Sequence, residues 1–155
     1  MLEGKIDKGI TLYGEIVGYT KGGTCIQSGY HYGCAQGQNR FIVYRVTSTN
    51  PDGVVTEFTD KQVRQYCEKY GLEVVNQLFY GKLSEFGIDH RDIARNITER
   101  FDIEKMCPMN NLEVPYEGIC IRRDGQTKYD TYKIKSKLFL GYETKLIDEG
   151  VEISS

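Results

Sequence analysis

Residues 40–48, RFIVYRVTS, and the segment that follows them contain the most regular patterns in the chain. The nine residues are rich in β-branched and aromatic side chains, and apolar and polar positions alternate, which predicts a β-strand. The sequence Asn50-Pro51-Asp52-Gly53 comes directly afterwards and has the composition of a turn. The segment therefore predicts a strand that ends in a tight turn.

A helix is predicted immediately after this strand and turn, in the sequence TDKQVRQYCEKYG of residues 59–71. Thr59 and Gln62 have the spacing of a capping box, in which each residue satisfies a backbone amide near the helix start. Gly71 is placed to end the helix. The apolar side chains between them recur at helical spacing and indicate core packing; they are Val63, Tyr66, Cys67 and Tyr70.

Strands and helices are predicted along the rest of the chain without regular βαβ alternation. The order predicts an α+β fold, with a mainly antiparallel sheet and flanking helices. Asp124-Gly125 is a hairpin signal between the last two strands. The expected strands are residues 10–19, 73–80, 113–123 and 129–136, and the expected helices are residues 89–100 and 138–149.

Length and composition are those of one globular domain over residues 1–155, for which we expect flexible ends at residues 1–9 and 150–155. The formal net charge is −2, which disfavours a polybasic nucleic-acid binder. Five cysteines without a C-x-x-C pair are typical of reduced thiols. No apolar run approaches a membrane span or a signal-peptide core, so a cytoplasmic location is expected.

Basic side chains gather near the C-terminus, where six of the residues from Arg122 to Lys137 are lysine or arginine. Lys133 and Lys135 are two positions apart on a predicted strand and therefore share a face. Two like charges on one face are costly unless an anion or solvent lies opposite them. One interpretation is a solvated surface; the other is a phosphate site, with Glu117 of the paired strand holding a divalent cation.

Four short motifs occur in order along the chain. They are Tyr13-Gly14-Glu15, Phe41-Ile42-Val43-Tyr44, Glu117-Gly118-x-x-Ile121-Arg122 and Lys133-x-Lys135-Ser136. In this order they resemble motifs III, IIIa, IV and V of the covalent nucleotidyltransferases, which are the ATP-dependent ligases and the mRNA capping enzymes. The sequence is most similar to the RNA ligase family of the phage and bacterial type that repairs nicked RNA. The resemblance covers roughly residues 11–140.

The resemblance implies a role for each matching residue, with ATP and Mg²⁺ or Mn²⁺ as cofactors. Glu15 would accept a hydrogen bond from the ribose, and Tyr44 would stack on the adenine. Phe41 is the alternative ring, although strand alternation puts Phe41 and Tyr44 on opposite faces. Glu117 would bind the metal near the α-phosphate. Two lysines would contact the phosphates, namely Lys133 and Lys135.

The family's nucleophile is a lysine in the sequence Lys-x-Asp-Gly, several tens of residues before motif III. The 155 residues contain no such sequence. The nearest match, Lys5-Ile6-Asp7-Lys8-Gly9, has one residue too many before its glycine and starts only ten residues before Glu15. We therefore expect the C-terminal part of a nucleotidyltransferase domain without motif I, unable to self-adenylylate alone.

Several alternatives share these motifs. The chain could be a fragment of a polynucleotide ligase, with RNA favoured over DNA as the partner, or a fragment of a capping-type guanylyltransferase that uses GTP. It could also be a non-catalytic nucleic-acid-binding module. A missing first part would expose core surface, which favours association with a separate N-terminal half or with a second copy.

Overall fold

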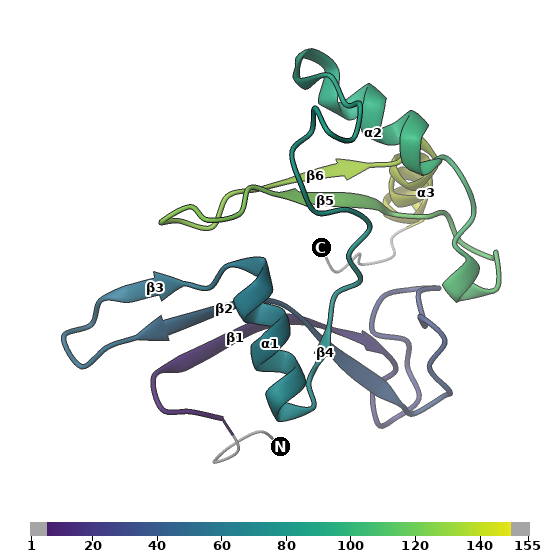
Figure 1. Cartoon of the computed structure of the whole chain (residues 1–155). Coiled ribbons are helices and arrows are strands. Elements are labelled where there is room, and N and C mark those ends of the chain that lie inside the picture. Colours follow the sequence, from purple (N-terminus) through teal and green to yellow (C-terminus); the bar gives the residue numbers. More distant parts are fainter. Residues whose placement is uncertain (1–5, 150–155) are drawn as a thin grey trace. The chain divides into compact units, whose positions relative to one another are not determined.

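The computed structural model describes residues 6–149, which form two compact units (Figure 1). The described parts of unit 1 are residues 6–16, 40–76 and 122–131, and those of unit 2 are residues 17–39, 77–121 and 132–149. Helices and antiparallel strands are mixed, which confirms the predicted α+β class. The strands are β1 (Ile10–Gly18), β2 (Asn39–Thr49), β3 (Val55–Glu57), β4 (Glu73–Val74), β5 (Gly118–Arg122) and β6 (Thr131–Lys135). The α-helices are α1 (Asp60–Tyr70), α2 (Ile93–Phe101) and α3 (Lys137–Asp148), and the short 3-10 helices are η1 (His90–Asp92) and η2 (Pro108–Asn110).

A four-stranded sheet in the order β1-β2-β3 is the centre of unit 1, with β4 also paired to β2. Strands β2 and β3 are antiparallel, with Thr47 opposite Glu57, whereas the short β4 runs parallel to β2. The predicted turn closes the β2–β3 hairpin: the Gly53 amide donates to the Asn50 carbonyl oxygen over 3.0 Å. The side-chain oxygen of Asn50 accepts from the Val54 amide over 2.8 Å.

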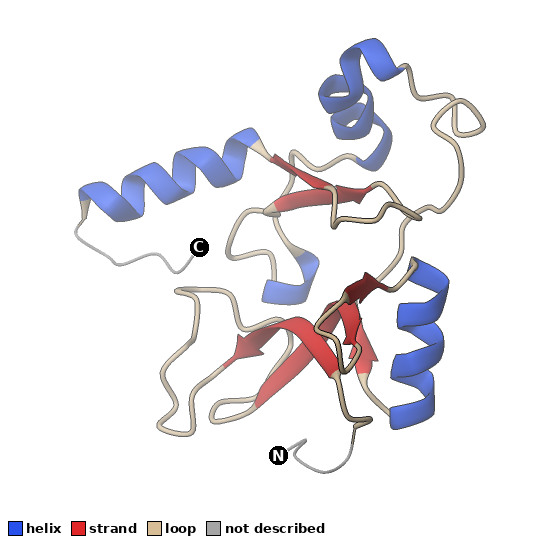
Figure 2. Ribbon diagram, turned by 90° about the vertical axis from the view of Figure 1, so that its left-hand side faces the viewer, coloured by secondary structure: helices blue, strands red, loops and turns tan. Residues whose placement is uncertain are grey.

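Helix α1 packs against the sheet of unit 1 (Figure 2). It begins and ends where the sequence predicts. Thr59 and Gln62 form the capping box, and Gly71 ends the helix in the left-handed conformation, with φ of 62°. The buried face of α1 contributes Val63 and Cys67 to the core of unit 1. These side chains pack with Val43 and Val46 of β2, and Ile10, Leu12 and Phe41 lie against the same cluster.

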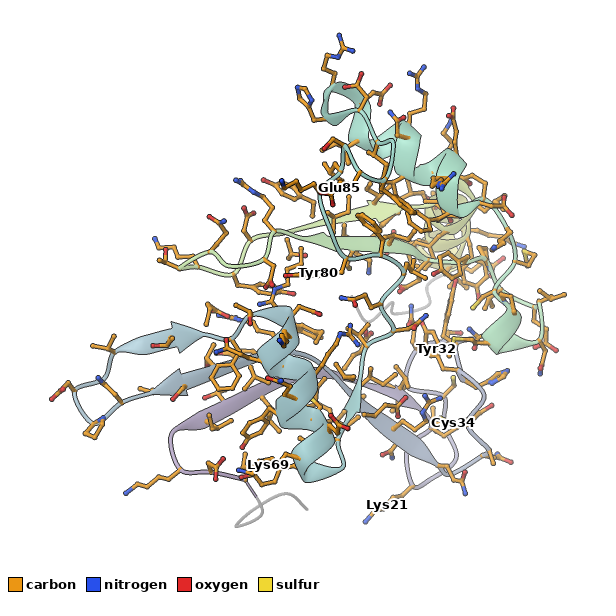
Figure 3. The ribbon with its side chains drawn as sticks, viewed as in Figure 1. Lys21, Tyr32, Cys34, Lys69, Tyr80 and Glu85 are labelled. Carbon is orange, nitrogen blue, oxygen red and sulfur yellow. The ribbon has the colours of Figure 1, made fainter. Side chains whose placement is uncertain are left out.

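The core of unit 2 consists of side chains that are far apart in the sequence. Tyr30, Cys107, Val114 and Phe139 are all buried in one cluster. The partly buried Tyr32, which is labelled in Figure 3, packs beside this cluster. The backbone amide of Tyr32 donates to the side chain of Asn110, itself fully buried. The glycine-rich loop before β2 is therefore part of a packed core.

Four predicted elements differ clearly from the structure in extent. Only Glu73–Val74 of the expected strand 73–80 is a strand, because the apolar side chains that follow, including Val75 and Leu78, are exposed and have no face to bury. The helix expected over residues 89–100 starts as the 3-10 turn η1 and continues as α2 through Phe101. The last two strands are shorter than predicted, and residues 123–130 connect them.

The ends of the chain are described only in part. Lys5 and residues 150–155 lie outside the described residues. Within the first nine residues, the Asp7 amide donates to the Tyr66 hydroxyl over 3.1 Å, and the Gly9 carbonyl oxygen accepts from the Thr49 amide over 2.7 Å. No helix within residues 6–149 has the length and hydropathy needed to cross a membrane.

Candidate functional site

Glu15 lies on β1 beside a point where two strands approach each other closely. It is exposed, and Gly14 precedes it. A Cβ at Gly14 would overlap both the ring of Phe41 and the carbonyl oxygen of Ile42. Glycine is therefore needed here so that the Phe41 ring can lie over the β1 backbone.

The two candidate stacking rings on β2 have different surroundings. Phe41 packs against the core cluster of unit 1, and its ring covers Gly14. Tyr44 is 40% exposed, and its ring centroid lies 6.3 Å from that of Tyr129. A ring that stacks on a base must offer a free face. Because Tyr44 is exposed and Phe41 packs against the core cluster, Tyr44 is the better candidate for the stacking ring.

Arg45, an arginine that the four motifs do not include, lies beside the rings of Tyr13 and Tyr129. The Arg45 guanidinium carbon is 4.1 Å from the Tyr13 ring centroid and 4.8 Å from that of Tyr129, within cation–π range of both. Its Nε donates to Glu57 over 3.0 Å, and this hydrogen bond raises the pKa of Arg45. Unit 1 thus holds a cationic group that contacts two aromatic rings and a carboxylate that neutralises its charge.

In unit 2, Glu117 lies just before β5 and contacts two other polar side chains. The amide nitrogen of Gln27 donates to Oε1 of Glu117 over 3.0 Å, and Nζ of Lys133 is 3.7 Å from Oε2. The Glu117 side chain is 22% exposed and that of Lys133 is 47% exposed. The structure thus places two of the predicted phosphate-site residues next to each other.

Gly118 explains why glycine follows Glu117 in the motif. Its φ is +144°, and a Cβ there would overlap the Ile134 carbonyl oxygen of β6. Only glycine avoids this overlap while keeping the backbone in that conformation. The close approach of β5 and β6 brings Glu117 next to Lys133.

Lys135 has a different carboxylate partner. Its Nζ donates to both oxygens of Glu143 on α3 over 3.0 Å, and it lies 5.1 Å from the ring centroid of Phe139. Ser136 comes next and is the N-cap of α3: its hydroxyl accepts from the Phe139 amide over 3.0 Å and donates to the Tyr116 carbonyl oxygen over 2.5 Å. Lys133 and Lys135 are therefore compensated separately, by Glu117 and by Glu143.

Tyr30 is a buried tyrosine that ties the glycine-rich loop to the segment before Glu117. Its hydroxyl donates to the Pro115 carbonyl oxygen over 2.7 Å, and its side chain is almost fully buried. Burial, with a smaller contribution from the negative charge of Glu117, raises the pKa of the Tyr30 hydroxyl. A small pocket borders this ring and is lined by Gln27, Ser28, Tyr30, Phe139, Tyr142, Glu143 and Leu146.

The side chains that could bind a metal ion together with Glu117 indicate which kind of metal site is possible there. Among residues 6–149 there is no group of three or more histidine, cysteine, aspartate or glutamate side chains that could enclose an ion. Mg²⁺ often binds through one or two carboxylates and completes its shell with water and substrate phosphates. Glu117 fits a metal that binds together with a nucleotide, whereas a closed structural metal site does not fit.

Two comparisons with known proteins bear on this site. A protein-family model described as RNA ligase matches residues 1–137, which is most of the chain and includes all four motifs. A search of curated proteins gave no match.

Proposed function

The chain belongs to the RNA ligase family, and from this we propose that it carries part of the adenylylation site of an ATP-dependent polynucleotide ligase, with RNA favoured over DNA as the substrate. The observation that carries the proposal is the contact between Glu117, just before β5, and Lys133 on the paired strand β6, whose side chains are 3.7 Å apart in unit 2. A carboxylate beside a lysine supplies both charges that a metal-bound phosphate needs.

Unit 1 contributes the proposed nucleoside contacts. Glu15 accepts a hydrogen bond from a ribose hydroxyl, which its exposed position on β1 allows. Tyr44 stacks on the adenine, and its 40% exposure supports this role. Phe41 packs in the core and instead sets the spacing between β1 and β2.

Unit 2 contributes the proposed phosphate and metal contacts. Lys133 and Lys135 bind phosphate oxygens and offset the charge that develops as pyrophosphate leaves. Glu117 would hold the Mg²⁺ or Mn²⁺ ion, which supplies further positive charge at the phosphates when it is bound. Binding of phosphate would exchange the contacts of the two lysines with Glu117 and Glu143 for contacts with the ligand.

The 155 residues contain no Lys-x-Asp-Gly sequence, so we propose that they do not form the covalent lysine–AMP adduct alone. A lysine attacks the α-phosphate only in its neutral form, which requires a site that lowers its pKa. The test is incubation of the chain with labelled ATP and Mg²⁺ or Mn²⁺. Covalent label that is lost in Lys5→Ala would contradict the proposal.

Nucleotide binding tests the rest of the site and separates it from a guanylyltransferase. We expect calorimetric titration with ATP and Mn²⁺ to show binding that is weakened at least about tenfold in Lys133→Ala, because a charge-assisted contact is worth about 1.5–3 kcal/mol. Tighter binding of GTP than of ATP would favour the capping-type alternative. If neither nucleotide binds, the chain is a non-catalytic module and the proposed site is wrong.

A further inference from the structure

We propose that Gln27 is a positioning residue for Glu117: its amide fixes the carboxylate in the orientation that receives the metal. Gln27 belongs to none of the four motifs and lies 90 positions from Glu117 in the sequence. The inference rests on the proposed function of Glu117 and adds a residue to that site.

The loop that carries Gln27 is held against the segment before β5. The Tyr30 amide donates to the Gln27 carbonyl oxygen over 2.9 Å, which closes a turn, and the Tyr30 hydroxyl donates to Pro115, two residues before Glu117. Gly29 in this turn has φ of +78°, and a Cβ there would overlap the side chain of Val114. The turn therefore packs tightly against the segment before β5, and Gln27 has little freedom to move away from Glu117.

The chemistry of the two groups fixes the direction of their hydrogen bond. An ionised carboxylate only accepts hydrogen bonds, so Gln27 must present its NH₂ group to Oε1 of Glu117. Lys133 lies nearer the other oxygen, 3.7 Å from Oε2. The neutral amide and the cation thus hold different oxygens of the same carboxylate.

This division matters because the last torsion of a glutamate side chain is broad and is poorly fixed by the chain itself. An amide anchored on Oε1 selects one orientation and leaves Oε2 on the side of Lys133, where the proposed phosphate binds. Residues that orient a metal ligand in this way are typically worth 10–100-fold in metal affinity. The structure therefore predicts an effect of Gln27 that is specific to the metal.

The first experiment measures ATP affinity of the 155-residue chain with Mn²⁺ and with EDTA, and compares their ratio among variants. We expect Gln27→Ala to lower the ratio at least about tenfold and to leave the affinity in EDTA unchanged. A purely structural role of Gln27 would lower both affinities together. Gln38→Ala removes an exposed glutamine from the same loop and should leave the ratio at its wild-type value.

The second experiment looks for a gain, which a loss of folding cannot imitate. Gln27→Glu places a second carboxylate beside Glu117 and makes a two-carboxylate site, so the variant should bind Mn²⁺ without nucleotide. We expect its free Mn²⁺ signal in electron paramagnetic resonance to fall relative to wild type. Adding Glu117→Gln to the variant should restore the signal.

The outcomes separate this inference from the proposed function. If Glu117→Gln lowers the Mn²⁺-to-EDTA ratio but Gln27→Ala does not, the metal role of Glu117 stands and the role of Gln27 is wrong. If neither variant changes the ratio, the metal assignment of Glu117 is wrong, and the inference falls with it. A folded Gln27→Glu variant that takes up no more Mn²⁺ than wild type also overturns the inference.

Discussion

The proposed ligand-binding side chains of the two units differ in whether they already contact a group of opposite charge. In unit 1 the proposed stacking residue Tyr44 is an exposed ring, and the cation beside it, Arg45, is neutralised by Glu57. In unit 2 both proposed phosphate lysines contact carboxylates, Lys133 through Glu117 and Lys135 through Glu143. In the proposed site, a base would therefore add to a ring that is already exposed, whereas a phosphate would have to replace existing ionic contacts.

The difference follows from the physical chemistry of each contact. Stacking needs only a free aromatic face, and an exposed tyrosine costs the fold little. Two lysines on one strand face repel each other, so opposite charges nearby are needed to offset the repulsion. Glu117, which precedes β5, supplies one of these negative charges, and Glu143 of α3 supplies the other. The ion pairs of the two proposed phosphate lysines thus also contribute to the stability of unit 2.

The largest effect is expected where unit 2 depends on a close backbone approach. Gly118→Ala should lower the free energy of unfolding by about 3 kcal/mol or more, because the methyl group overlaps the Ile134 carbonyl oxygen and the backbone conformation is strained. Gly125→Ala is the matched control: its φ is also positive, at +71°, but its Cβ would meet open space. The control should lose only about 1 kcal/mol in urea denaturation. Equal losses in the two variants would show that the close contact is unimportant.

Substitutions of the two aromatic residues of β2, Tyr44 and Phe41, test the proposed nucleoside contacts of unit 1. Tyr44→Ala should weaken ATP binding by about 1–3 kcal/mol, which is the usual value of one base–aromatic stack, with little change in stability. Tyr44→Phe keeps the ring and should bind nearly as well as wild type. Phe41→Ala should do the reverse and lower stability, since its ring packs against the core cluster. Calorimetry for affinity and urea denaturation for stability separate these effects, and loss of affinity in Phe41→Ala without loss of stability would reverse the assignment.

A smaller effect is expected from Tyr30, whose raised pKa makes the stability of unit 2 depend on alkaline pH. In the unfolded chain a tyrosine loses its proton near pH 10, whereas buried Tyr30 keeps its proton to higher pH. Above about pH 10 the unfolded state binds fewer protons than the folded state, so stability falls as pH rises. Tyr30→Phe should cost about 1 kcal/mol at neutral pH, through the lost bond to Pro115. Its deficit should shrink above pH 10, as measured by urea denaturation across that range; a constant deficit would contradict the prediction.

The sequence predicted the local features of this molecule well. The helix α1 depends on Thr59, Gln62 and Gly71, which act within one helix, and each behaves as its pattern indicates. The residues that the sequence analysis missed act over long separations. Gln27 and Glu117 are 90 residues apart, and nothing in a glycine-rich loop indicates which of its polar side chains will contact Glu117. The alternation of side chains along a strand predicted that Lys135 shares a face with Lys133. It could not show that Glu143 of the next helix would form an ion pair with Lys135.

The smallest effect concerns Glu143 and tests directly whether the lysines of unit 2 are held by contacts that a ligand must replace. Glu143→Gln removes the charge that competes with phosphate for Lys135, so affinity for ATP with Mn²⁺ should rise about threefold, in line with the modest value of partly exposed ion pairs. Glu149→Gln removes the same charge from the end of α3, where Glu149 contacts Lys145, and should leave the affinity unchanged. In unit 1, Glu57→Gln should loosen Arg45 without any gain in affinity, because a stacked base replaces no ionic contact there. If Glu143→Gln binds ATP more weakly than wild type, then Glu143 orients Lys135 for the ligand, and the two units differ less than the ion pairs in the structure indicate.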